Sequence, residues 1–164
     1  MSDEIRPPVP VFEHAPDAYR AMLRLDQAVS AALDHTLFEL IKLRASQING
    51  CAYCIDMHTK DARAAGETED RLALLPAWRE TRLYSEEERA ALALTEAITL
   101  IASGHVPPAV EDRAREVFNE ATYANVVFAA TLINAWNRLA ITAHSEPGHY
   151  QPKQPKQPTP AAAS

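Results

Sequence analysis

The chain has 164 residues, of which 47% are hydrophobic and 23% charged, and its formal net charge is −6 from 16 basic and 22 acidic residues. This length suits one domain with its own core, and the acidic balance without a basic block argues against a nucleic-acid partner. No apolar run approaches the ~20 residues of a membrane span, and the N-terminus does not resemble a secretory signal, so we expect a cytoplasmic protein without a membrane partner.

Helix-forming residues dominate the chain between a few glycines and prolines. Ala, Leu, Glu and Arg recur throughout, and no stretch alternates apolar and polar residues as a half-buried strand would. Gly50, Gly66 and Gly104 are expected to end helices, because glycine readily takes the left-handed conformation that closes a last turn. The sequence therefore predicts an all-α bundle of about six or seven helices, at residues 17–33, 35–49, 51–65, 68–75, 85–102, 108–118 and 121–143.

The two ends of the chain differ in composition from the rest. Residues 1–11 are rich in proline and are expected to form an extended arm. Residues 145–164 hold five of the twelve prolines and a Gln-Pro-Lys repeat, which is typical of a disordered tail. The predicted helical domain therefore covers residues 12–144.

Cys51 and Cys54 are the only cysteines, and they form a Cys-x-x-Cys pair. The loop between them is too short to stabilise a domain of this size, and in a reducing compartment such a pair is more often catalytic or metal-binding. Gly50 ends one predicted helix and Cys51 begins the next, where free N–H groups and the helix dipole favour a thiolate. This argument predicts that Cys51 is the more acidic thiol and that Cys54, one turn further, can pair with it.

Two further side chains can serve these thiols as an acid–base couple. His58 lies four residues after Cys54, on the same helix face, and could take the thiol proton and return it. Glu39 lies on the preceding helix, which a tight turn at Gly50 would fold back so that its carboxylate orients the imidazole. Tyr53 is expected to lie at the mouth of the site, as pocket lining or as plain packing.

The cysteine pair allows other interpretations. The pair could be two small buried side chains, or Cys51, Cys54 and His58 could bind zinc with Glu39 or His144 as a fourth ligand. Structural zinc usually recruits a second ligand pair at short spacing, which the chain lacks. A haem attachment site would need histidine directly after Cys54. The sequence thus favours a redox site with no metal and no bound cofactor.

The motif Glu39-x-x-x-Leu-Arg-x-Ser-x-x-Asn-x-Cys51-x-Tyr-Cys54-x-x-x-His58 resembles the alkylhydroperoxidase D-like (AhpD-like) family of the carboxymuconolactone decarboxylase superfamily. The segment Leu-Ile-Asn-Ala-Trp-Asn-Arg at residues 132–138 is similar to that family's final helix. The resemblance covers about residues 12–145. It implies an all-helical fold that assembles into trimers or hexamers.

The resemblance also implies an activity, namely reduction of alkyl hydroperoxides by the thiol pair. Cys54 would be oxidised to a sulfenic acid, and Cys51 would donate a proton and then form the Cys51–Cys54 disulfide. His58 and Glu39 would relay protons, and an external dithiol, either a protein or a lipoyl-type group, would restore the thiols. The best-known members carry a second histidine where this chain has Tyr53.

The sequence is compatible with two other functions. The superfamily name suggests a lactone decarboxylase, although that chemistry needs no thiol pair. A redox sensor or adaptor without turnover would use the same reversible disulfide to change an interaction.

Overall fold

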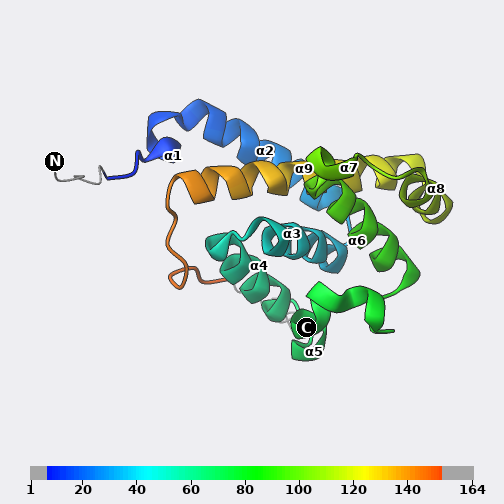
Figure 1. Ribbon diagram of the computed structural model, residues 1–164. Coiled ribbons are helices and arrows are strands. Elements are labelled where there is room, and N and C mark those ends of the chain that lie inside the picture. Colours follow the sequence, from blue (N-terminus) through cyan, green and yellow to red (C-terminus); the bar gives the residue numbers. More distant parts are fainter. Residues whose placement is uncertain (1–6, 153–164) are drawn as a thin grey trace, which may run out of the picture.

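The computed structural model describes residues 7–152, and within that range the fold is entirely helical, as the sequence predicts (Figure 1). The helices are α1 (Val11–His14), α2 (Pro16–Ala32), α3 (His35–Asn49), α4 (Ala52–Ala64), α5 (Glu69–Leu74), α6 (Glu86–Thr99), α7 (Ile101–Gly104), α8 (Pro108–Val117) and α9 (Glu120–Thr142), with a 3-10 helix, η1 (Leu75–Glu80), after α5.

The structure differs from the predicted helices mainly in short elements. The four-residue helices α1 and α7 and the 3-10 helix η1 were not expected. Val11 begins α1 although it was assigned to the extended arm. The helix predicted over residues 68–75 corresponds to α5, which ends at Leu74, and the chain continues as η1. Pro76 fits the first turn of η1, where a backbone N–H group would have no partner within the helix. The positive φ expected at Gly104 occurs one residue later, at His105.

Helix α3 lies at the centre of the fold and contacts α4, α6 and α9. Asp34 caps its N-terminus by accepting a hydrogen bond from the Leu37 amide at 3.1 Å. Residues 37–43 are all buried, so this helix is covered on every side rather than along one stripe. At its C-terminus Gly50 takes the left-handed conformation, with φ of 68°, and turns the chain so that α4 packs back against α3.

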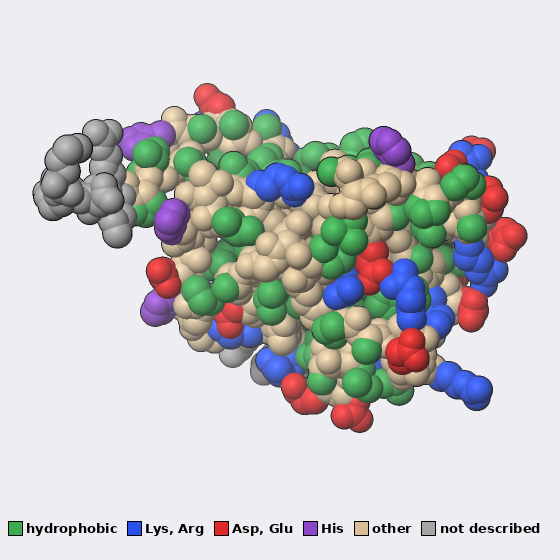
Figure 2. All heavy atoms as spheres, in the orientation of Figure 1, with side chains coloured by type: hydrophobic (Ala, Val, Ile, Leu, Met, Phe, Trp, Pro, Cys, Tyr) green, Lys and Arg blue, Asp and Glu red, His purple; other side chains and the backbone are tan. Residues whose placement is uncertain are grey.

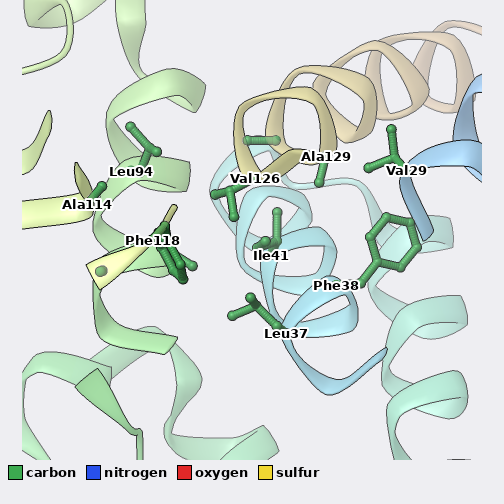
Figure 3. Packing of buried hydrophobic residues seen from close by; sticks show 12 residues of the cluster. Val29, Leu37, Phe38, Ile41, Leu94, Ala114, Phe118, Val126 and Ala129 are labelled. Carbon is green, nitrogen blue, oxygen red and sulfur yellow. The ribbon is translucent and has the colours of Figure 1, made fainter. Parts of the chain in front are cut away.

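Two hydrophobic clusters lie on different sides of α3. The larger one joins side chains of α2, α3, α6, α8 and α9, and nine of its residues are labelled in Figure 3: Val29, Leu37, Phe38, Ile41, Leu94, Ala114, Phe118, Val126 and Ala129. The other joins α3 to α4, α5, η1 and α6 and includes Leu40, Leu43, Leu75, Trp78 and Leu92. The long helix α9 runs across the molecule and covers α3 (Figure 1).

The chain after α9 returns along α4 and is held there by hydrogen bonds. The Gly148 amide donates to Asp56 Oδ2 at 3.0 Å, and Lys60 Nζ donates to the carbonyl oxygen of Tyr150 at 3.1 Å. The Tyr150 hydroxyl donates to the Asp61 carboxylate. Residues 145–152 belong to the segment for which the sequence predicts disorder, and Gly148 and Tyr150 within it are hydrogen-bonded to α4; the rest of that tail lies outside the described residues.

The surface carries closely mixed charges. Figure 2 shows basic and acidic side chains interspersed toward the end of the molecule that holds α6 and α8. Arg113 of α8 pairs there with Glu86 of α6, and Arg115 pairs with Glu111 along α8. Within residues 7–152, none of the helices combines the length and the apolar character that a bilayer crossing would need.

The turn at Gly50 yields a stability prediction. Replacing Gly50 by alanine forces an L-residue into the left-handed region at a cost of ~1–2 kcal/mol, part of which is offset by the stiffer unfolded chain. We expect Gly50→Ala to lower the free energy of unfolding by about 1 kcal/mol in urea denaturation.

Gly104→Ala is the matched control, because Gly104 is helical, has no left-handed φ and has open space around an added Cβ. This variant should be neutral or more stable by up to ~1 kcal/mol. Equal destabilisation of both variants would contradict the assignment of strain to the Gly50 turn.

Candidate active site

Glu39 and His58 form a buried pair between α3 and α4. Glu39 Oε2 lies 2.8 Å from His58 Nδ1, and the two residues are only 5% and 3% exposed. A carboxylate at this distance fixes the imidazole with its Nδ1–H toward Glu39. The other ring nitrogen, His58 Nε2, is buried and has no hydrogen-bond partner among residues 7–152. The pair therefore presents a nitrogen lone pair that is free to accept a proton.

Glu39 keeps its charge in spite of its burial. Desolvation alone would raise the pKa of Glu39, but the hydrogen bond and the charge of His58 lower it, helped by the charges of Lys42 and His35. The result is a pKa of Glu39 below its ordinary value of 4.5. At neutral pH this carboxylate is therefore ionised.

The two cysteines lie at the start of α4, where the sequence places them. Cys51 is the N-cap residue, and its Sγ accepts a hydrogen bond from the Cys54 amide at 3.4 Å. Both residues are 1% exposed, and both thiols are free. Burial and the hydrogen bond with Cys51 raise the pKa of Cys54 to about 12, although Asn137 and Lys42 act in the opposite direction. Cys54 is thus a neutral thiol at physiological pH and needs a base to become a nucleophile.

A cavity of about 720 Å³ brings Cys54 and the acid–base pair together. Cys54, His58, Glu39 and Tyr53 line it, together with an aromatic wall of Phe12, Tyr19 and Trp136, whose ring centroids are 5.3 to 6.5 Å apart. Cys51 does not line this cavity. It faces a smaller one of about 180 Å³, with Tyr53 and His144. A molecule in the larger cavity would meet Cys54, with Cys51 behind it.

Asn49, which the sequence suggests as a hydrogen-bonding residue of the turn, belongs to a polar network that holds the turn in place and whose α9 members were not predicted. Asn137 of α9 donates to Ser46 Oγ at 3.0 Å, and Asn49 Nδ2 donates to the side-chain oxygens of Asn134 and Asn137 at 2.9 and 2.8 Å. This ties the last turn of α3, next to Gly50, to α9. The sequence signal for the α9 part of the network is a pair of asparagines, Asn134 and Asn137, three residues apart in a predominantly apolar helix.

Lys42 and Asp61 also line the cavity, and neither was predicted. Lys42 is 4% exposed and pairs with Asp26 of α2 at 2.6 Å. Asp61 has a carboxylate oxygen within 4.8 Å of ligand-type atoms of Glu39 and His58. These three groups are already hydrogen-bonded to one another or to Tyr150. Among the described residues no further His, Asp or Glu group gathers with the cysteines as a zinc site would require.

Comparison with known proteins gives the family. The sequence model of the carboxymuconolactone decarboxylase family matches residues 16–97. The chain belongs to this family. Two further matches show that it is AhpD-like. One is to a protein named alkyl hydroperoxide reductase AhpD, and the other is to a crystal structure described as a candidate AhpD.

Similar proteins include uncharacterized and AhpD-named members. The uncharacterized protein YdfG of Bacillus subtilis is 47% identical over 134 residues, which are 81% of this chain and 91% of YdfG. The alkyl hydroperoxide reductase AhpD of Bradyrhizobium diazoefficiens is 42% identical over 50 residues, 30% of this chain and 28% of that protein.

The fold is similar to a solved AhpD-like structure. A crystal structure of a protein of unknown function from Agrobacterium tumefaciens, a candidate AhpD of antioxidant defence, superposes with a TM-score of 0.83 at 36% identity. The match covers 88% of this chain and all of that one. These likenesses show an AhpD-like fold within the carboxymuconolactone decarboxylase family.

The buried pair gives a pH-dependent stability prediction. Because the folded pKa of Glu39 lies below its unfolded value, its charge contributes stability above about pH 4.5 that is lost as pH falls through the folded pKa. Glu39→Gln keeps the size but loses the charge, so we expect it to lower the free energy of unfolding near neutral pH by ~1–3 kcal/mol.

Urea denaturation from about pH 7 to about pH 3 measures this difference. It should shrink below about pH 4.5, whereas the exposed Glu80→Gln should differ little from the wild type at any pH. A difference for Glu39→Gln that is constant with pH would contradict the stabilised charge.

Proposed function

We propose that the protein is a thiol-dependent peroxidase that reduces organic hydroperoxides through a reversible Cys51–Cys54 disulfide. One observation carries the proposal: Cys54 lines a cavity beside His58, whose Nε2 is unpartnered and whose Nδ1 is bonded to an ionised Glu39. A neutral, buried thiol next to an oriented base is the arrangement that nucleophilic thiol chemistry requires.

In the first half of the reaction, His58 Nε2 takes the proton of Cys54, directly or through a water. The thiolate attacks an oxygen of the hydroperoxide, the O–O bond breaks, and Cys54 becomes a sulfenic acid. The leaving alkoxide takes the proton from His58 and departs as an alcohol. Glu39 stabilises the imidazolium between these two proton transfers.

In the second half, the Cys51 thiol attacks the sulfur of the sulfenic acid and water leaves, which forms the Cys51–Cys54 disulfide. Two electrons and two protons from an external dithiol then restore both thiols. The position of Cys51 behind Cys54 suits a resolving thiol, because it does not compete for the substrate in the larger cavity. The dithiol donor and a trimeric or hexameric assembly are part of this proposal through the family likeness.

The cavity supports an organic rather than a very small substrate. Its volume of about 720 Å³ and its aromatic wall of Phe12, Tyr19 and Trp136 would bury a substantial apolar group. Hydrogen peroxide would leave most of this surface unused. We therefore expect an alkyl or aryl hydroperoxide to have a higher kcat/KM than hydrogen peroxide.

Substitution of the site residues tests the proposal. We expect Cys54→Ser to abolish consumption of cumene hydroperoxide by the prereduced protein, because the attacking sulfur is gone. Cys51→Ser should allow one oxidation of Cys54 without dithiol-driven turnover, and His58→Ala should slow turnover by ~10²-fold or more. The exposed His14→Ala is the control and should turn over normally.

The measurements are peroxide loss with several dithiol donors and the mass of the intact protein with and without reductant. The wild type should lose the mass of two hydrogens on oxidation. Undiminished turnover in Cys54→Ser would refute the proposal. Lactone decarboxylation that survives loss of both cysteines would identify a decarboxylase, and reversible oxidation without turnover would identify a sensor.

A further inference from the structure

Asp61 gives the site a second carboxylate, which the proposed reaction has not used. It lies on α4, three residues after His58, and its carboxylate lies within 4.8 Å of both Glu39 and His58. It also lines the same cavity as Cys54. The imidazole of His58 therefore has one carboxylate hydrogen-bonded to Nδ1 and another close by from its own helix.

Asp61 is held by a residue far away in the sequence. The Tyr150 hydroxyl lies 2.7 Å from one Asp61 oxygen and 2.9 Å from the other. Tyr150 belongs to the segment of residues 145–150, which is anchored on α4 through Asp56 and Lys60. Ser145, Glu146 and Tyr150 of this segment line the cavity. The segment after α9 thus forms one wall of the site and fixes a charged group inside it.

We propose that Asp61, fixed by Tyr150, is a positioning residue of the thiol reaction and that docking of residues 145–150 completes the site. It acts through His58. When His58 takes the proton of Cys54, the positive charge that forms lies near two carboxylates instead of one, which favours the ion pair of imidazolium and thiolate. This inference rests on the proposed function and adds Asp61 and Tyr150 to it.

The charges around Asp61 set the pH at which it acts. Glu39 and His35 face it from α3, His58 from α4 and Tyr150 from the C-terminal segment, while Lys42 is paired with Asp26. Burial and the charge of Glu39 raise the pKa of Asp61, whereas the Tyr150 hydrogen bond and the two histidines oppose the rise. Loss of the Tyr150 hydroxyl should therefore raise the pKa of Asp61 further. Asp61 would then lose its charge at a higher pH.

Tyr150→Phe tests this directly, because it keeps the ring against α4 and removes only the hydroxyl. We expect the acidic limb of the pH profile of kcat/KM for cumene hydroperoxide to move upward by about half a pH unit or more. Tyr84→Phe is the matched control, since the Tyr84 hydroxyl donates to the Arg71 carbonyl and Tyr84 does not line the cavity. It should leave the limb in place.

Asp61→Asn removes the charge itself. We expect kcat to fall about tenfold with little change in KM, because the charge favours the proton transfer rather than substrate binding. Asp61→Glu should recover part of the loss. Adding Tyr150→Phe to Asp61→Asn should have no further effect on the acidic limb, since the hydroxyl then has no carboxylate to act on.

A second readout keeps the inference separate from peroxide turnover. The rate at which iodoacetamide alkylates Cys54 in the prereduced protein, followed by peptide mass spectrometry across the pH range, reports how easily the thiolate forms. Asp61→Asn should slow this alkylation and Tyr150→Phe should move its pH dependence in the same direction as kcat/KM. A wild type that alkylates as expected but consumes no hydroperoxide would refute the proposed function alone.

Other outcomes overturn the inference itself. If Tyr150→Phe and Asp61→Asn lower the urea midpoint but leave kcat, the acidic limb and the alkylation profile unchanged, Tyr150 is only a tether for the C-terminal segment. An equal shift of the limb in Tyr84→Phe would show that the effect is not local to Asp61.

Discussion

The site depends on one interaction, the hydrogen bond between Glu39 and His58 in the protein interior. An ionised carboxylate is costly to bury unless it has a partner of opposite charge or several donors, so α3 and α4 must pack closely enough to keep this hydrogen bond. The left-handed turn at Gly50 sets the direction of α4, and the asparagine network from α9 fixes that turn. The stability of the fold and the proposed chemistry therefore both require the same packing of α3 against α4.

The need for a fixed packing of α3 is consistent with its burial on all sides. Its apolar side chains are divided between two clusters, and Glu39 and Lys42 from the same helix line the cavity. Lys42 is paired with Asp26 of α2, and Glu39 is hydrogen-bonded to His58 of α4, so each of these buried charges has its partner on a different neighbouring helix. These pairs thus specify the orientation of α3 more tightly than apolar packing alone would.

The sequence predicts well what is local. The helix over residues 35–49 has a capping aspartate before it and a glycine after it, and Glu39, Cys51, Cys54 and His58 lie within twenty residues joined by one turn, so helical spacing alone brings them close. The contacts of Asn137 with Ser46 and of Tyr150 with Asp61 span 91 and 89 residues, and no local pattern contains them. Composition predicts a disordered tail from residue 145 and does not contain the hydrogen bonds that Gly148 and Tyr150 make with α4.

In the proposed cycle, the capping role of Cys51 limits the structural cost of oxidation. Its sulfur accepts the Cys54 amide in the reduced state, and formation of the disulfide would replace that weak contact with a covalent bond inside the same first turn of α4. The change falls on a helix terminus, where backbone N–H groups have no partners within the helix and are most easily rearranged. Glu39 and His58 lie outside that turn, so the base can keep its geometry in both redox states. The same placement that hides Cys51 behind Cys54 thus separates the part of the site that changes from the part that must stay fixed.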